Sequence, residues 1–377
     1  MRWQNLKSEN NGSGSRLPGL EEPSTVRTFD SPEALDVRFH EVHARSAINA
    51  VPERSRMPFR FTINPYRGCT HGCTYCFARP THTYLGFNAD RDFDREIVVK
   101  VNAPELVRAE LGRSSWAGGH VALGTNTDPY QWVESKYRLM PGIWEAMRDF
   151  SNPCSVLSKS PLLLRDVKLF KEISERTEFV ANLSIPTLDE KAWRASEPHT
   201  PHPRTRIAAL AELNRVGIST GVLIAPLMPG INDDPAEVEK ILELVGEAGA
   251  GSVGGIGLHL RSETRGVFMD WLRQYRPDLV STYERLYSNG AYLPKAQRER
   301  LARLASGGRR PRRFEAEPRP VVRGGGRGSG GARAARGTGG NRQKGGSIDV
   351  PRGRRANSSA RPVLPAEPQT RRQARLF

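Results

Sequence analysis

Three of the four cysteines in this 377-residue chain stand within eight residues of one another. Cys69, Cys73 and Cys76 have the spacing Cys-x3-Cys-x2-Cys, and Gly68 and Gly72 directly precede the first two. Glycine permits the tight turns that can aim several thiolates at one point. Converging thiolates bind soft metals and iron–sulfur clusters. A four-iron cluster held by only three cysteines has one open iron, and we expect chemistry to occur there.

Two other roles for these cysteines remain open. The first is a structural zinc site, with His71 or His82 as a fourth ligand. Zinc motifs usually consist of two separated ligand pairs, however, and the chain has no second pair with such spacing. The second is a disulfide, but three clustered cysteines and a distant Cys154 do not resemble a secreted disulfide framework.

The net charge of +16 is unevenly distributed along the chain. Residues 307–377 contain 18 Lys and Arg against 4 Asp and Glu, whereas the rest contains 39 against 37. This Arg/Gly-rich tail has too few apolar residues to offset the entropy of ordering, so we expect disorder. It is either a solvated extension or a segment that attracts the phosphates of a nucleic acid without sequence preference.

The sequence predicts a cytoplasmic protein that does not enter a membrane. It has no run of about 18 apolar residues. Residues 1–5 are polar and lack the apolar segment of a secretory signal. Few cysteines, grouped as for a metal, indicate a reducing compartment.

Short apolar segments alternate with amphipathic ones between about residues 59 and 260. This alternation predicts an α/β fold with parallel strands and right-handed crossovers, either a partial (β/α)6 barrel or a doubly wound open sheet. Expected strands are 59–64, 120–124, 154–158, 179–185, 220–225 and 253–260, and expected helices are 105–113, 141–150, 161–174, 202–216 and 235–248. The predicted domains are a flexible leader and wrap (1–50), a core (51–263), a helical cap (264–306) and the disordered basic tail (307–377).

Polar residues directly follow several of the expected strands. The catalytic and binding residues of a parallel barrel lie at these C-terminal strand ends. The same residue types also cap helices and form turns, so a structural role is the alternative. Histidines in the later loops are candidate substrate contacts. The residues concerned are Thr125, Asn126 and Asp128, then Ser158 and Lys159, then Ser184, the loop at Pro226, and His199, His202 and His259.

The cysteine spacing, with Tyr75 directly before Cys76, closely resembles the signature of the radical S-adenosylmethionine (SAM) superfamily. The resemblance implies the barrel fold and a 4Fe-4S cluster on Cys69, Cys73 and Cys76, with SAM chelated to the open iron. It implies reductive cleavage of SAM to a 5′-deoxyadenosyl radical that abstracts hydrogen from a substrate. It also implies an external electron donor such as flavodoxin or ferredoxin.

The segments Asn64–Cys69, Gly124–Gln131 and Pro229–Asp233 resemble the branch related to spore photoproduct lyase, and in particular its uncharacterised actinobacterial members. The resemblance covers roughly residues 51–261. By analogy, Thr125, Asn126 and Asp128 lie where the SAM amino group is held. Ser158, Lys159 and Ser184 lie where the carboxylate or ribose is held, and Tyr75 and the Pro226 loop would flank adenine.

One departure from that branch concerns the substrate. Spore photoproduct lyase has a hydrogen-donating cysteine where this chain has Gly124. Cys154 begins an expected strand, so we expect it at the opposite end of the barrel, in a packing role. Thymine-dimer repair is therefore not expected, and the substrate is unknown, with nucleic acid as a candidate. The alternative function is a zinc-stabilised nucleic-acid-binding protein without catalysis.

Overall fold

The larger of two β-sheets contains six parallel strands and one edge strand. The computed structural model in which it is seen describes residues 6–8, 24–32, 34, 36–53, 55 and 57–307. The order is β12-β11-β10-β9-β8-β5-β4, in which only the edge strand β4 (Ile48–Ala50) is antiparallel to its neighbour. The parallel strands are β5 (Phe61–Ile63), β8 (Val121–Leu123), β9 (Cys154–Ser158), β10 (Phe179–Ser184), β11 (Thr220–Leu227) and β12 (Ser252–Gly257).

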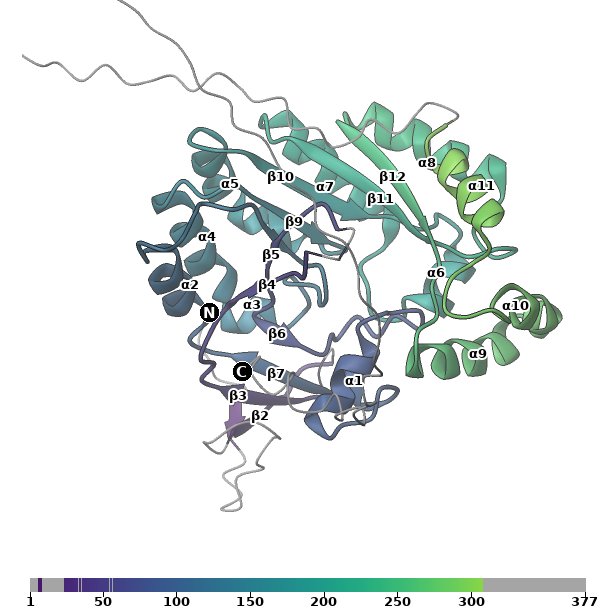
Figure 1. The fold of residues 1–377 in the computed structure, drawn as a ribbon, viewed down its shortest axis with the longest axis horizontal. Helices are drawn as coiled ribbons and strands as arrows, with labels where there is room; N and C mark the ends of the chain where they lie inside the picture. Colours follow the sequence, from purple (N-terminus) through teal and green to yellow (C-terminus); the bar gives the residue numbers. More distant parts are fainter. Residues whose placement is uncertain are drawn as a thin grey trace, which may run out of the picture. The chain divides into compact units, whose positions relative to one another are not determined.

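Amphipathic helices alternate with these strands and cover the outer side of the sheet (Figure 1). In α4, for example, Ile143, Trp144 and Met147 recur at helical spacing and are all fully buried. The parallel strands follow one another in chain order without the reversal of a doubly wound sheet, and this order confirms the predicted partial (β/α)6 barrel. The helices are α2 (Ala103–Leu111), α4 (Leu139–Asp149), α5 (Val167–Ser174), α7 (Pro203–Arg215), α8 (Pro235–Glu247) and α11 (Lys295–Ala305).

Local sequence explains where several helices begin. The Asp234 side chain accepts hydrogen bonds from the backbone N–H groups of Ala236 and Glu237, and Pro235 occupies the first turn of α8. The expected helix 161–174 begins instead as the 3-10 helix η2 (Pro161–Asp166), which Ser160 caps. Other short elements are η1 (Arg79–Leu85), α1 (Asp92–Arg95), α3 (Glu134–Tyr137) and α6 (Glu190–Ser196).

A second, five-stranded sheet was not predicted. Its order is β1-β2-β3-β7-β6, and it buries a small core that includes Phe29, Phe39, Tyr66, Ile97 and Val99. The prediction that the leader and wrap (1–50) begins as a flexible segment is therefore wrong for residues 6–8 and 25–29, which form strands. The strands are β1 (Leu6–Ser8), β2 (Thr25–Phe29), β3 (Arg38–Val42), β6 (Tyr66–Arg67) and β7 (Glu96–Lys100).

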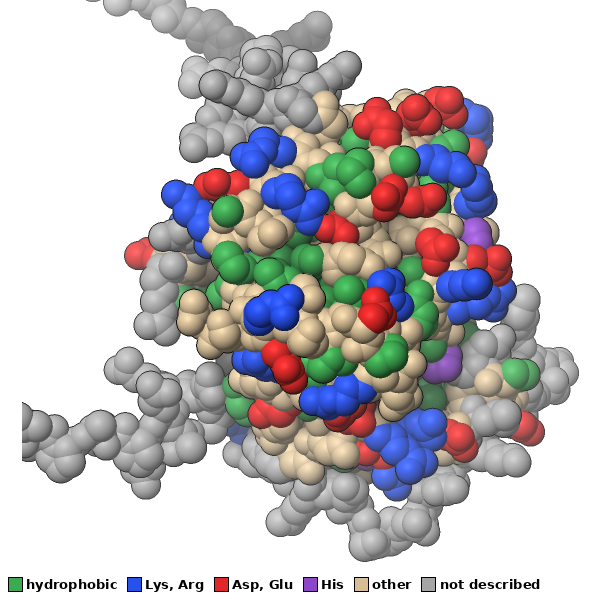
Figure 2. All heavy atoms as spheres, turned by 90° about the vertical axis from the view of Figure 1, so that its right-hand side faces the viewer, with side chains coloured by type: hydrophobic (Ala, Val, Ile, Leu, Met, Phe, Trp, Pro, Cys, Tyr) green, Lys and Arg blue, Asp and Glu red, His purple; other side chains and the backbone are tan. Residues whose placement is uncertain are grey.

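The expected C-terminal helices are present as α9 (Glu263–Tyr275), the short η3 (Pro277–Leu279), α10 (Val280–Leu286) and α11. Acidic and basic side chains are interspersed on the face that carries α9 and α10 (Figure 2), in keeping with the nearly balanced charge of residues 1–306. Among the described residues, no helix is both long and apolar enough to cross a membrane. The predicted disordered tail lies, except for residue 307, outside the described residues.

A glycine-to-alanine pair tests how closely β8 and β9 approach each other. A Cβ at Gly124 would lie 1.9 Å from the Leu157 carbonyl oxygen, whereas one at Gly118 would have no neighbour within 4 Å. Both glycines have positive φ. We expect Gly124→Ala to cost about 3 kcal/mol, from strain plus overpacking, and Gly118→Ala about 1 kcal/mol from strain alone. Thermal melts of both variants measure the difference, and equal losses would contradict this geometry.

Candidate functional site

A cavity of about 210 Å³ opens at the C-terminal ends of the parallel strands. All three clustered cysteines line it, together with six of the seven residues expected to contact SAM. Thr125 is the exception and does not line the cavity. The six are Tyr75, Asn126, Asp128, Ser158, Lys159 and Ser184, and Pro226 and His259 also contribute to the wall.

The loop that carries the cysteines is irregular but buried, so its backbone polar groups need partners. The buried Gln131 side chain accepts from the Thr70 N–H at 2.8 Å and donates to the Gly68 carbonyl at 3.2 Å. The buried guanidinium of Arg79 donates to the carbonyls of Gly72 and Cys73 at 2.9 and 3.0 Å. These contacts fix the loop from two sides without using the thiols.

Glycine is required at one turn of this loop. Gly68 has a φ of 78°, and a Cβ there would lie 2.8 Å from both the Phe93 carbonyl oxygen and a ring carbon of His82. The close approach brings Cys69 against Phe93, whose carbonyl accepts from the Cys69 N–H at 2.9 Å.

The three thiols are free and suited to bind metal. Burial raises the pKa of each, to about 12 for Cys73. Hydrogen bonds from backbone N–H groups lower these pKa values. The N–H of Asp128 donates to Cys69, and those of Ala78 and Arg79 donate to Cys76. Such N–H donors stabilise thiolates and tune iron–sulfur clusters. The site therefore fits a thiolate-bound cluster.

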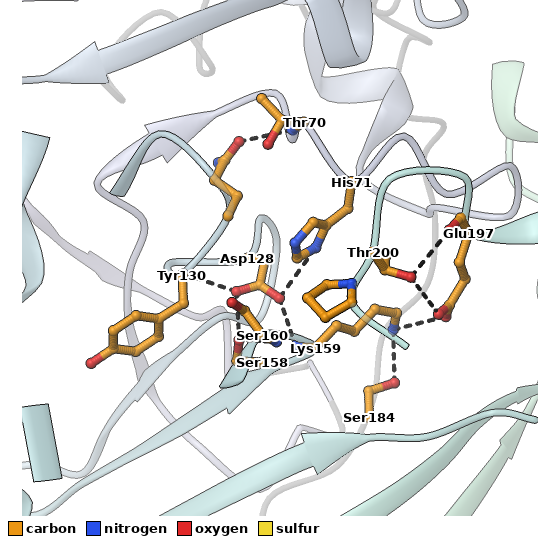
Figure 3. A network of polar contacts seen from close by, with 12 residues as sticks. Thr70, His71, Asp128, Tyr130, Ser158, Lys159, Ser160, Ser184, Glu197 and Thr200 are labelled. Atoms are coloured by element: carbon orange, nitrogen blue, oxygen red, sulfur yellow. Dashed lines mark hydrogen bonds and ion pairs between the residues drawn. The ribbon is translucent and has the colours of Figure 1, made fainter. Parts of the chain in front are cut away.

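Asp128 joins the ends of two strands to the cysteine loop (Figure 3). Its carboxylate accepts from the Ser158 hydroxyl at 2.8 Å and from the backbone N–H groups of Lys159 and Tyr130 at 2.7 and 2.9 Å. His71 Nδ1 lies 3.4 Å from the same carboxylate. Because these partners already engage both oxygens, the geometry gives Asp128 a positioning role. Direct contact with SAM stays a prediction for this residue.

Lys159 extends from the end of β9 toward the end of β10 (Figure 3). Its ammonium donates to the Ser184 hydroxyl at 2.7 Å and lies 3.6 Å from Glu197 Oε1. Its Nζ is also 5.8 Å from the centre of the Tyr75 ring. Lys159, Ser184 and Tyr75 are thus brought together, and their contact with SAM stays a prediction.

Sequence reasoning missed the fully buried carboxylate of Glu197, just after α6. It accepts hydrogen bonds from the Tyr75 hydroxyl, from Arg206 at 2.5 Å and from Thr200 at 3.1 Å. Burial alone would raise the pKa of Glu197, but Arg206 and Lys159 lower it to about 2. The carboxylate is therefore ionised and neutralises one of the two neighbouring cations. The only sequence signal was a Glu within the proline-rich loop 197–203.

The geometry gives no support to a site for a single metal ion. Among the residues that the structure describes, no three His, Cys, Asp or Glu side chains are grouped to hold one ion. His82 is occupied elsewhere, because its Nε2 lies 2.9 Å from the Glu96 carbonyl oxygen. A cluster separates its thiolates more widely than a single ion does, since each thiolate binds a different iron.

The remaining candidates differ in how they lie relative to the cavity. His202 caps α7 by accepting from the Arg204 N–H at 3.1 Å, and neither it nor His199 lines the cavity. Cys154 begins β9 and is fully buried, as expected for a packing residue. Of the three predicted histidines, His259 alone reaches the cavity wall.

The stability contributed by Glu197 depends on pH. Its folded-state pKa is lowered, so the contribution is present above the unfolded value near 4.5 and is lost as the pH falls toward 2. We expect Glu197→Gln to lower the melting temperature at pH 7, with the difference from the unmodified chain shrinking below about pH 4.5. Glu190→Gln, which breaks an exposed pair with Arg194, is the control and should change little. A pH-independent difference would contradict the pairing.

Comparison with known proteins places this site in a family. The Radical SAM superfamily model matches residues 63–245. An uncharacterized protein of Mycobacterium tuberculosis is 43% identical over 304 residues, which cover 80% of this chain and 89% of that protein. A radical SAM Nα-GlyT isomerase of Pseudomonas phage M6 is 30% identical over 186 residues, 48% of this chain and 36% of the isomerase.

Solved structures of spore photoproduct lyase share the fold. A mutant of that enzyme aligns with a TM-score of 0.52 and 16% identity, over 71% of this chain and 77% of the lyase. Another mutant, with bound AdoMet and dinucleoside spore photoproduct, aligns with a TM-score of 0.51 and 14% identity, over 71% and 79% of the two chains. These likenesses show the fold alone. The family model that matches residues 63–245, with the arrangement of the cysteine loop, shows that the chain belongs to the radical SAM superfamily.

Proposed function

We propose that Cys69, Cys73 and Cys76 hold a 4Fe-4S cluster and that SAM binds beside it in the cavity. The observation that carries this proposal is that three free thiols and the Lys159–Ser184 pair open into one cavity. Cluster and SAM, when bound, supply the reductive cleavage that yields a 5′-deoxyadenosyl radical for hydrogen abstraction. An external donor such as flavodoxin or ferredoxin would supply the electron.

The charges around Lys159 favour a ligand with a carboxylate. Two cations, Lys159 and Arg206, share the single negative charge of Glu197. Arg206 is fully buried behind that carboxylate, so the surplus positive charge lies on Lys159, at the cavity wall. A carboxylate on SAM would balance it, and the Ser184 hydroxyl lies within reach of the same group.

The other walls exclude water from the reacting atoms. Leu157, Leu223, Ala225 and Leu258 line the cavity with aliphatic carbon. Such a lining strengthens the electrostatic contacts inside and protects a reactive species from solvent. Asp128 holds the ends of β8 and β9 together and so keeps Asn126 and Lys159 in register.

For the substrate we favour nucleic acid, but not the reaction of spore photoproduct lyase. Support comes from the structurally similar lyase, one structure of which contains a dinucleoside spore photoproduct. The excess of basic residues in 307–377 also suits a polyanion. Position 124 has no room for the hydrogen-donating cysteine of the lyase, because a Cβ there would meet Leu157 at 1.9 Å.

Cysteine variants test the cluster assignment. Anaerobic reconstitution of the unmodified chain with iron and sulfide should give a brown protein that releases 5′-deoxyadenosine from SAM after reduction. Cys69→Ala, Cys73→Ala and Cys76→Ala should lose both properties, whereas Cys154→Ala, at the far end of β9, should keep them. A colourless protein with one zinc per chain would favour the non-catalytic nucleic-acid-binding alternative instead.

A lysine variant tests how SAM is held. Lys159→Met removes a charged hydrogen-bond donor and should weaken equilibrium binding of SAM by about 10- to 100-fold. Glu197 keeps Arg206 as its partner in this variant, so the cluster should still assemble. The exposed Lys168→Met is the control. Equal SAM affinity in both variants would show that the ammonium does not contact the ligand.

A further inference from the structure

Three aromatic rings follow one another at the rim of the cavity, the first pair tilted and the second pair stacked. The centre of the Phe77 ring lies 5.7 Å from that of His259, with 34° between the ring planes. His259 in turn stacks on Tyr292 at 5.6 Å and 24°. We call Phe77, His259 and Tyr292 the aromatic ladder. Phe77 and His259 line the cavity, and Tyr292 extends the stack outward.

Backbone contacts hold the ladder in place before any ligand binds. His259 and Tyr292 form an antiparallel bridge, and the Leu260 N–H donates to the Ala291 carbonyl at 2.7 Å. The buried Tyr287 hydroxyl donates to the Leu258 carbonyl at 2.6 Å. Leu258 and Leu260 are both buried, so the alternation of an extended chain turns His259 outward.

The end rings are exposed although they are large and apolar. Phe77 is 48% exposed and Tyr292 is 57% exposed, and the neighbouring Ile256 at the rim is 53% exposed. Phe77 and Tyr292 therefore offer exposed ring surface on which a flat ligand could stack. Clustered exposed rings beside a cavity mark a binding surface, whereas isolated ones are common on any protein.

Three arginines lie on the segments that carry or contact the ladder. Arg261 stands two positions after His259 in the chain. The guanidinium of Arg298 donates to the Leu293 carbonyl, next to Tyr292, and that of Arg265 donates to the Tyr287 carbonyl. Glu263, the first residue of α9, is acidic. The three guanidinium groups supply positive charge of the kind that binds phosphates beside stacked bases.

We propose that the aromatic ladder binds a single-stranded nucleic acid by stacking bases on Phe77 and Tyr292 while the neighbouring arginines contact phosphates. The base on Phe77 would then lie next to the nucleotide that enters the cavity. Flat π faces suit any base, and the excess of basic residues in 307–377 suits the same polyanion. This proposal names the substrate class of the proposed function. It rests on that function because it takes the same cavity as the active site.

The test measures binding to Tyr292→Ala, a variant at an exposed position that leaves the cysteines untouched. The probes are a fluorescein-labelled oligothymidylate of twelve nucleotides and an abasic oligomer with the same phosphates. Anisotropy titrations use the full chain without iron or SAM, in enough salt to suppress electrostatic binding by residues 307–377. Tyr84→Ala, at a 54% exposed tyrosine for which no ring contact is found among the described residues, is the matched control. Tyr292→Trp keeps an aromatic face.

Tyr292→Ala should weaken binding of the oligothymidylate by about 5- to 100-fold and leave the abasic oligomer unaffected. Tyr84→Ala and Tyr292→Trp should bind both as the unmodified chain does. Unchanged binding of the oligothymidylate by Tyr292→Ala, or equal losses for both probes, would overturn the proposal. So would tight binding of a Phe-rich peptide together with no binding of the oligothymidylate. Because the assay requires neither cluster nor turnover, these outcomes leave the radical SAM proposal untouched.

Discussion

The need to satisfy the polar backbone of a buried, irregular loop governs the arrangement of this molecule. A loop that points three thiols into one cavity cannot also form a regular ladder of backbone hydrogen bonds, so its partners must come from elsewhere. Gln131 supplies them from the segment after β8, Arg79 from η1, and Thr264 from the start of α9, where its hydroxyl donates to the Cys76 carbonyl. The Ser196 carbonyl at the end of α6 accepts from the Thr74 N–H. The barrel thus fixes the loop at several points that are distant in sequence.

Buried charge is the second constraint. Glu197 and Arg206 are both fully buried, and each would be costly without the other. Their pairing leaves Lys159 as the group whose charge a ligand can balance, and the Tyr75 hydroxyl joins this network to the cysteine loop. The same contacts that stabilise the folded chain therefore set the electrostatics of the cavity. We therefore expect replacement of Glu197 to change both the stability of the fold and the electrostatics of the cavity.

Much of this arrangement could be predicted from the sequence because it depends on local patterns. The alternation of apolar strands and amphipathic helices predicts the barrel, and the rule for strand ends selects Asn126, Lys159 and Ser184. Glu197, Arg206 and Gln131 could not be found in this way, because their roles depend on which loops meet in space. The second sheet was missed for a similar reason, since β2 and β3 are short and the apolar residues they bury are few. Asp128 lines the cavity, but its engaged oxygens favour positioning over direct binding, and its place in a SAM site stays a prediction.

The central claim is that three thiolates hold a cluster whose open iron faces a SAM-binding cavity. Electron paramagnetic resonance of the reduced, anaerobically reconstituted protein tests it most directly, with spectra recorded before and after SAM is added. We predict the signal of a reduced 4Fe-4S cluster, with g values that change when SAM coordinates the open iron. A protein that assembles no cluster, or one whose signal is unaffected by saturating SAM, would contradict the account.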